Sequence, residues 1–279
     1  MKQKQPDYIE LLKKSLYNLA NHPVIFIPFI LGFFLFILLA GVVVLEGLFM
    51  ITSFNVSIET LFPSMISSSI MFMIGALFIF IDLVLMFMFG AYITAMTYVG
   101  FYQVSVKNKV SLDSMIKGAR PLFLNVLKFS LIKFAIFFIP ITIVAGIIVG
   151  LVFVNLILAI VLGIMLFMIL MAYMIYMGFA IFFMGPMIAS SRKPIMTLLR
   201  GSFQYLHNNV THVLFTWVIL LCIGIVLAMV VVPLQLSASI IPFILIPVFG
   251  FRVIMQIVVG VYTNLFLFNS YFNVNKVKK

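Results

Sequence analysis

The sequence predicts an all-α integral membrane protein with six transmembrane helices. The 279-residue chain is 65% hydrophobic and 8% charged, whereas a soluble globular chain is usually about 45–50% apolar and about 25% charged. Six apolar runs each approach or exceed the roughly 20 residues that a helix needs to cross a bilayer. The 17 Lys and Arg residues outnumber the 6 Asp and Glu residues. All of the Lys and Arg residues except Lys133 and Arg252 lie at the two ends of the chain or between alternate apolar runs.

The segment before the first apolar run is polar and basic, and it does not have the features of a cleavable signal peptide. Its cations are Lys2, Lys4, Lys13 and Lys14. The apolar run that follows is longer than the hydrophobic region of a signal peptide, and no A-x-A-like cleavage site follows it.

The predicted spans cover residues 24–45, 69–100, 129–151, 158–184, 212–233 and 243–270. The second and sixth are long, so we expect them to tilt or to project beyond the bilayer. A short turn around Asn155 joins the third span to the fourth. Pro140 should bend the third span, because proline removes a backbone donor and clashes with the preceding turn.

The cations predict the orientation of the chain. The connection after the second span carries Lys107, Lys109, Lys117 and Arg120, the one after the fourth carries Arg192, Lys193 and Arg200, and the tail carries Lys276, Lys278 and Lys279. The alternate connections, about 46–68, 152–157 and 234–242, carry no Lys or Arg. Because basic connections stay on the cytoplasmic side, we expect a multi-pass plasma-membrane protein with both termini cytoplasmic and Glu46 on the outer side.

A short basic phrase occurs three times, as LLKKSLYNLAN (11–21), MIKGARPLFLN (115–125) and LLRGSFQYLHN (198–208). Each copy precedes a pair of spans. On a helical wheel the first and third copies separate an apolar face from a polar one, which is typical of a helix lying in the membrane interface. In the middle copy Ser111 is the expected N-cap, and Pro121 should end the helix early.

These features predict one polytopic membrane domain built from three units, about 6–102, 111–188 and 194–273. Each unit is an interfacial amphipathic helix followed by a hairpin of two spans. The alternative is that the phrases are basic linkers of similar composition, such as any multispan protein carries.

The stretch FMGPMIASSRKPIMTLLRGSFQYLHNNVTHVLF resembles the six-span membrane domain that is fused to some bacterial glycerophosphodiester phosphodiesterases. The residues that carry the likeness are Pro186, Arg192, Arg200, Ser202, Phe203 and Asn208. The opening KSLYNLANHPVIFIP looks like that family's first unit, although the family commonly has Trp where this chain has Phe203. The resemblance implies a six-span architecture and an uncharacterised membrane role. The given sequence carries no phosphodiesterase domain, so that activity is not expected.

Two charged residues fall deep inside predicted spans, Asp82 in the second and Arg252 in the sixth. A charge at mid-bilayer costs about 2.5–3.5 kcal/mol on insertion scales and usually faces a partner or water. The two lie at similar distances from the basic residues that follow their spans, Lys107 and Lys276. We therefore expect an intramembrane ion pair, which either docks the first hairpin on the last or forms a gate or polar site in a translocation path. The remaining alternative is that the two residues never meet.

Polar residues near these charges form a candidate polar path of Gln256, Asn264, Thr94 and Thr97. A second set is expected to contact inner-leaflet lipids, where each nearby cation is worth about 1 kcal/mol. That set is Lys13, Lys14, Lys117, Arg120, Arg192, Lys193 and Arg200.

The sequence lacks the motifs of most catalytic and cofactor sites. His22, His207 and His212 have no metal-ligand spacing, and Cys222, the single cysteine, can form neither an intrachain disulfide nor a CxxC site. No G-x-S-x-G, Walker or G-x-G-x-x-G motif is present. We expect no catalytic residue, no cofactor and no metal.

The expected function is that of a non-enzymatic membrane protein that takes part in lipid-associated membrane organisation or acts as a scaffold. Its expected partners are membrane lipids, above all an anionic inner leaflet. A protein partner or homo-oligomer is left open, and nucleic acid is not expected. The alternative is a transporter for a small solute or lipid, with a polar path near Asp82 and Arg252.

Overall fold

The computed structural model describes residues 6–59, 64–191, 193–240 and 245–276. Every regular element in these residues is a helix. Six helical segments are long and apolar enough to cross a membrane, and they cover Pro23–Leu48, Met73–Lys107, Leu112–Val154, Leu156–Ser190, Val210–Ser237 and Ile246–Asn275. The predicted all-α class and the six membrane-length segments are therefore confirmed for the described residues.

The elements follow one another with few intervening residues. In chain order they are α1 (Tyr8–Asn21), η1 (Pro23–Phe26), α2 (Ile27–Glu59), α3 (Ser64–Tyr102), η2 (Gln103–Lys107), α4 (Leu112–Val154), α5 (Leu156–Ile181), α6 (Met184–Ser190), α7 (Ile195–Asn208), α8 (Val210–Ile240) and α9 (Leu245–Lys276). Element η1 is a 3₁₀ turn and η2 is a π-helical turn.

Local sequence explains where several of these helices begin and end. Asp7 caps α1, since its carboxylate accepts hydrogen bonds from the backbone N–H groups of Ile9 and Glu10. Asn155 ends α4 and also caps α5, whose Leu158 N–H donates to its side chain. The predicted turn around Asn155 is thus a single residue.

The middle basic phrase departs from its prediction, because it is not a separate interfacial helix. The capping box of Ser111 and Ser114 starts α4 where expected, but the helix continues unbroken through Pro121 and Pro140. Its buried residues Met115, Ala119, Leu122, Val126 and Phe129 recur at helical spacing on both sides of Pro121. This continuous packing face holds the helix together despite the backbone donor that proline removes.

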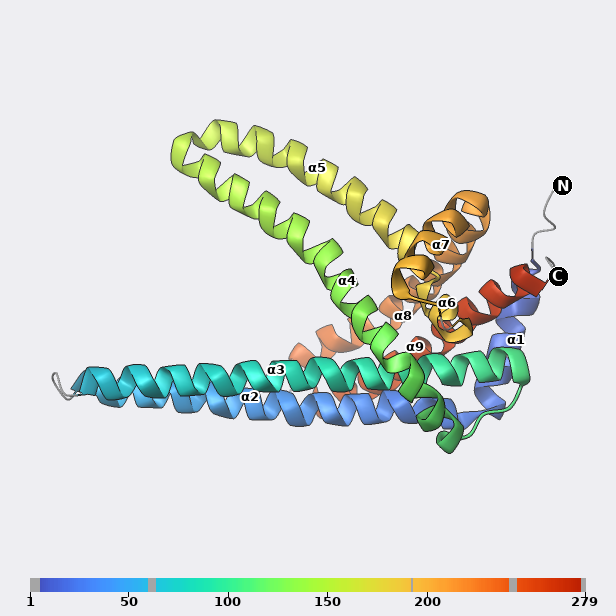
Figure 1. Cartoon of the computed structure of the whole chain (residues 1–279), viewed down its shortest axis with the longest axis horizontal. Helices are drawn as coiled ribbons and strands as arrows, with labels where there is room; N and C mark the ends of the chain where they lie inside the picture. The colour runs from blue at the N-terminus through green and yellow to red at the C-terminus, as the bar shows by residue number, and fades with distance from the viewer. Residues whose placement is uncertain (1–5, 60–63, 192, 241–244, 277–279) are drawn as a thin grey trace.

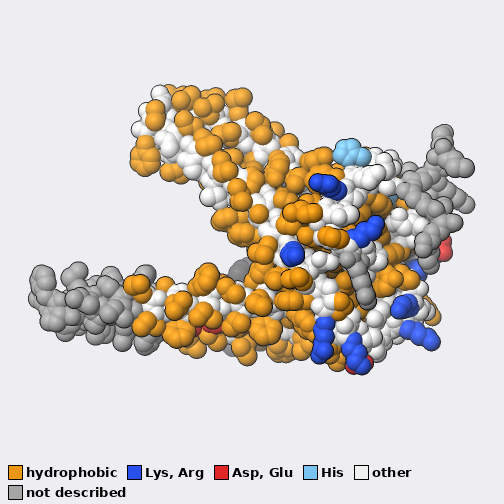
Figure 2. Space-filling view, viewed as in Figure 1, with side chains coloured by type: hydrophobic (Ala, Val, Ile, Leu, Met, Phe, Trp, Pro, Cys, Tyr) orange, Lys and Arg blue, Asp and Glu red, His pale blue; other side chains and the backbone are white. Residues whose placement is uncertain are grey.

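The long helices form three pairs, α2 with α3, α4 with α5 and α8 with α9, here called the arms. Figure 1 shows that the α4–α5 arm diverges from the α2–α3 arm, and that α1, α6 and α7 gather where the arms meet, beside both termini. We call this region the basic end, because the Lys and Arg side chains visible in Figure 2 lie there while the arms are covered with apolar side chains.

The buried core lies at the basic end. One cluster contains Ala95, Val126, Met184 and Val213, which come from α3, α4, α6 and α8. A second joins η1, α3, η2 and α9 through buried residues such as Ile25, Phe101 and Phe268. Further out, Phe153 is 86% exposed and Ile157 is 75% exposed. Many other large apolar side chains on the arms are exposed as well. Such an extensive apolar surface is typical of a protein that lies in the hydrocarbon region of a membrane.

Candidate anionic-ligand pocket at the basic end

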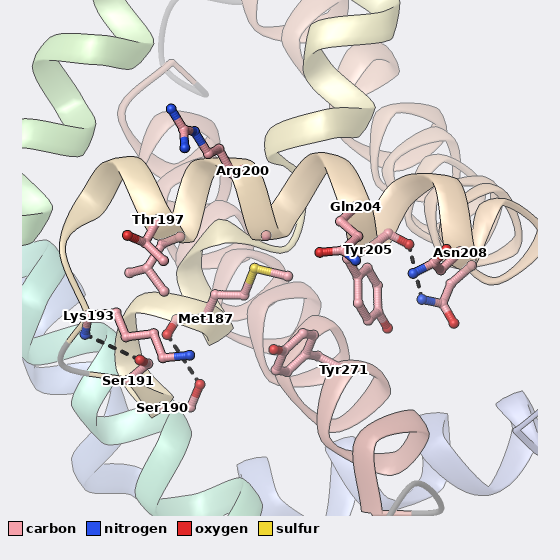
Figure 3. Close-up of a pocket in the computed structure, with 13 residues that line it drawn as sticks. Met187, Ser190, Ser191, Lys193, Thr197, Arg200, Gln204, Tyr205, Asn208 and Tyr271 are labelled. Carbon is pink, nitrogen blue, oxygen red and sulfur yellow. Dashed lines mark hydrogen bonds between the residues drawn. The ribbon is translucent and has the colours of Figure 1, made fainter.

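A polar pocket of about 510 Å³ lies between α6, α7, their linker and α9. Figure 3 shows α7 along one side and Tyr271 of α9 on the other, with Lys193 reaching in from the linker toward Ser190 and Tyr271. Arg200 also lines the pocket, but its guanidinium points away from these residues. Lys193 is thus the cation that faces the interior.

The linker holds Lys193 through two backbone hydrogen bonds. The Lys193 N–H donates to Ser191 Oγ at 3.2 Å, and Asn125 Nδ2 of α4 donates to the Lys193 carbonyl at 3.2 Å. These bonds fix the backbone from which the exposed Lys193 side chain extends.

Helix α7 supplies one wall of the pocket, and its two faces differ in polarity. Ile195, Leu198, Ser202, Tyr205 and Leu206 are buried. The other face carries Thr197, Gln204 and Asn208, which line the pocket at helical spacing. Hydroxyl and amide groups therefore line the same pocket as Lys193.

Two lining residues carry buried polar atoms that are left without a hydrogen-bond partner, Tyr205 Oη and Asn209 Oδ1. A buried polar atom without a partner costs about 1–3 kcal/mol, and native proteins usually satisfy such atoms with protein, water or a ligand. Burial is the main cause that raises the pKa of Tyr205 above the ordinary tyrosine value. Electrostatic interaction with the neighbouring Tyr271 and Tyr8 raises this pKa further. Its hydroxyl therefore remains a donor at physiological pH.

The pocket contains two of the residues expected to contact lipid, Lys193 and Arg200. Lys117 forms an ion pair with Asp113 at 2.8 Å. Lys13, Lys14 and Arg120 are exposed at the basic end, and Arg192 lies outside the described residues. Sequence reasoning did not select Gln204, Tyr205, Asn208 or Tyr271 as site residues. For Gln204 and Asn208, the polar face of the third basic phrase was the available signal.

The expected ion pair between Asp82 and Arg252 is not formed, although the structure describes both residues. Asp82 instead lies close to Glu46 of α2, although Asp82 Oδ2 and Glu46 Oε2 have no hydrogen-bond partner. The reason is the pairing of α2 with α3, which places a residue of α2 against Asp82 along the same arm. Similar depth in the chain does not determine which face of a helix a residue occupies.

The expected polar path is not assembled as one site. The Thr94 and Thr97 hydroxyls donate to the Gly90 and Ile93 carbonyls at 2.8 and 2.9 Å. Asn264 Nδ2 donates to the Gly260 carbonyl at 2.7 Å, so three of the four residues bond within their own helices. Gln256 is exposed on α9. Asn264 also lines a separate cavity, which is described below.

A buried polar chain beside the pocket was also missed. Tyr8 Oη and His212 Nδ1 lie 3.0 Å apart, and His212 Nε2 lies 3.2 Å from Ser270 Oγ, which lies 3.1 Å from Thr216 Oγ1. The chain joins α1 to α8 and α9. Small polar residues inside apolar spans were the signal, since such groups seek partners on other helices.

Comparison with known proteins adds no relative. No family model matches the chain, and no curated protein or solved structure matches it either. Among the described residues, no group of three or more His, Cys, Asp or Glu side chains is arranged to hold a metal ion.

Proposed function

We propose that this is a non-enzymatic, lipid-associated membrane protein that binds anionic phospholipid head groups at its basic end and so organises the leaflet around it. It crosses the plasma membrane as three hairpins, with both termini and the basic end in the cytoplasm. The same proposal keeps the resemblance to the membrane domain of glycerophosphodiester phosphodiesterases, as an architecture without the phosphodiesterase reaction.

The observation that carries this proposal is the pocket that Lys193 lines together with hydroxyl and amide groups. A phosphodiester has one negative charge and several acceptor oxygens, and it is bound well by an ammonium with surrounding neutral donors. None of the residues that line the pocket is acidic. The pocket therefore suits an anion better than a cation.

The surfaces of α1 and α7 support a position at the membrane interface. Leu16 is 60% exposed on α1 and Met196 is 59% exposed on α7, while Lys13 and Arg200 are exposed on the same helices. A helix that exposes both kinds of side chain is suited to the boundary between acyl chains and head groups. Both helices also have a buried side that packs on the arms.

The transporter alternative has less support. It needs a polar route near Asp82 and Arg252, and the ion pair that would anchor that route is not formed. Three of its four candidate polar residues hydrogen-bond within their own helices.

Head-group binding is tested by titrating phosphatidylglycerol into the full chain held in phosphatidylcholine nanodiscs, with bound lipid counted by native mass spectrometry. Lys193→Gln removes the cation, and Gly201→Leu adds bulk where a Cβ meets nothing within 4 Å. Lys193→Gln should weaken binding about tenfold, since a hydrogen bond from a charged group to the lipid is lost. Gly201→Leu should also weaken binding, because Gly201 lines the pocket.

The matched control is Lys109→Gln, which removes an exposed cation that does not line the pocket. Equal effects of Lys109→Gln and Lys193→Gln would show that bulk positive charge, and not the pocket, attracts the lipid. No effect of any variant would refute the proposed function.

A further inference from the structure

A second cavity, of about 310 Å³, lies where the α4–α5 arm leaves the rest of the molecule. Its walls include Tyr98 of α3, Lys133 of α4, Gly178 of α5, Gly185 of α6 and Asn264 of α9. It shares no lining residue with the pocket at Lys193. The two are therefore separate spaces that substitutions can address one at a time.

Lys133 has no counter-charge in this cavity. It lies five residues beyond Lys128, about 7.5 Å further along α4, in a helix that is apolar enough to cross a membrane. None of the residues that line the cavity is acidic. An ammonium at such a depth must reach back to the surface or meet an anion.

The other polar groups of the cavity are able to donate to an anion. Asn264 uses its Nδ2 for the Gly260 carbonyl at 2.7 Å, and an amide nitrogen has a second hydrogen to give. The Tyr98 hydroxyl is a further donor on the wall. Together with the Lys133 ammonium these groups suit a phosphate.

The surroundings of the cavity suit a lipid better than a soluble anion. Phe129, Phe137, Phe182 and Phe268 line it, and the α2–α3 and α4–α5 arms diverge (Figure 1). Phe134 of α4 is 57% exposed and Phe89 of α3 is 48% exposed. Acyl chains attached to a phosphate in the cavity would therefore have apolar surface to lie against.

We infer that this cavity holds the phosphate of one anionic phospholipid, with Lys133 as its charge partner and the acyl chains along the α3 and α4 surfaces. This second site is embedded in the membrane and goes beyond the proposed head-group pocket. It does not require Lys193, so the two sites can fail independently.

The site is tested with phosphatidylglycerol that carries a photoactivatable diazirine on an acyl chain, incorporated into nanodiscs with the full-length chain. Crosslinked peptides are identified by mass spectrometry. We expect crosslinks on α3 and α4, and about a tenfold loss of them in Lys133→Gln, because a charged hydrogen bond is removed. Gly178→Phe should also reduce the crosslinks. Gly178 lines the cavity and a Cβ there meets nothing within 4 Å, so the phenyl ring would take the place of the phosphate.

Three controls make the result decisive. Lys133→Arg should restore crosslinking, and its failure to do so would count against a charge partner. Lys128→Gln and Gly224→Phe should leave crosslinking unchanged, because neither residue lines the cavity. Circular dichroism on each variant confirms that it is folded, and a thermal midpoint like that of the parent excludes a general loss of structure.

The outcomes separate this inference from the proposed function and from a soluble ligand. Unchanged crosslinks in Lys133→Gln would overturn the inference, because the lipid would then not depend on Lys133. Displacement of the lipid by millimolar inorganic phosphate would overturn the choice of a lipid. Loss of surface binding in Lys193→Gln with intact crosslinking would leave both proposals standing.

Discussion

Gly118 of α4 lies against the stiff side chain of Val99 in α3. This glycine marks a close approach of the two helices. A Cβ at Gly118 would lie 2.7 Å from Val99 Cγ1 and 3.2 Å from its Cγ2. At Gly100 a Cβ would lie 2.7 Å from Met115 Cε, which is the end of a flexible side chain. Glycine lets the two backbones approach, as in other membrane helix pairs.

We predict that Gly118→Ala lowers the free energy of unfolding by about 1–3 kcal/mol, the usual cost of overpacking a filled contact. Gly146→Ala is the matched control, because a Cβ there meets nothing within 4 Å. Denaturant titration in detergent micelles measures both. Equal destabilisation by the two variants would contradict the close approach.

The meeting of Asp82 with Glu46 gives a second prediction at the residue scale. Asp82 Oδ2 and Glu46 Oε2 are both buried with no hydrogen-bond partner. Asp82→Asn provides an amide donor for Glu46 in place of a second carboxyl, so we expect equal or higher thermal stability. A double-mutant cycle should give a coupling of about 0.5–3 kcal/mol between positions 82 and 46 and none between 82 and 252. Coupling to Arg252 instead would restore the ion pair expected from the sequence.

Helix α1 is held to the last arm by buried polar contacts as well as by packing. Asn269 Nδ2 donates to Ser15 Oγ at 2.9 Å, and the Tyr8–His212 contact lies nearby in the same interface. The His212 ring also stacks on Phe183 with 5.6 Å between ring centroids. Both nitrogens of one imidazole thus connect α1 to α9.

We predict that His212→Leu loosens α1, because it leaves Tyr8 and Ser270 without this partner, at a cost of about 1–3 kcal/mol. Hydrogen–deuterium exchange should rise across residues 8–21. The matched control is His207→Leu, since His207 is exposed and its ring contacts the Phe203 carbonyl of its own helix at 2.8 Å. Unchanged exchange in His212→Leu would show that packing alone holds α1.

The elements also mark how far sequence patterns can reach. The first and third basic phrases were predicted to be short helices, and α1 and α7 cover them almost residue for residue. The middle phrase was predicted to end at Pro121, but α4 continues because its buried face is shared with α3 and α6. A local breaker is visible in sequence, whereas the packing that overrides it comes from residues far away in the chain.

At the scale of the whole molecule, charge is separated from apolar surface. The cations visible in Figure 2 lie at the basic end, and the arms extend away from it. With the positive-inside rule, this arrangement predicts which parts of the chain face the cytoplasm. The buried core lies at the same end because helices from all three arms converge there.

We predict opposite labelling of two single-cysteine variants made in a Cys222→Ser background. Asn155→Cys, at the turn between α4 and α5, should react with a membrane-impermeant maleimide in intact cells. Lys109→Cys should react only after permeabilisation. The reverse pattern would invert the proposed orientation, and labelling of both in intact cells would contradict an odd number of crossings between them.

The sequence by itself predicted an apolar surrounding for this protein, its six membrane-length segments and the side of these segments on which the cations lie. These properties depend on composition and on periodicity along one segment, so each segment expresses them alone. The tertiary structure decided which segments face each other: Asp82 meets Glu46, His212 links α1 to α9, and Lys193 and Lys133 line separate cavities. A long transmembrane-type helix is apolar on every face. Its sequence therefore carries little information about which face packs against a neighbour.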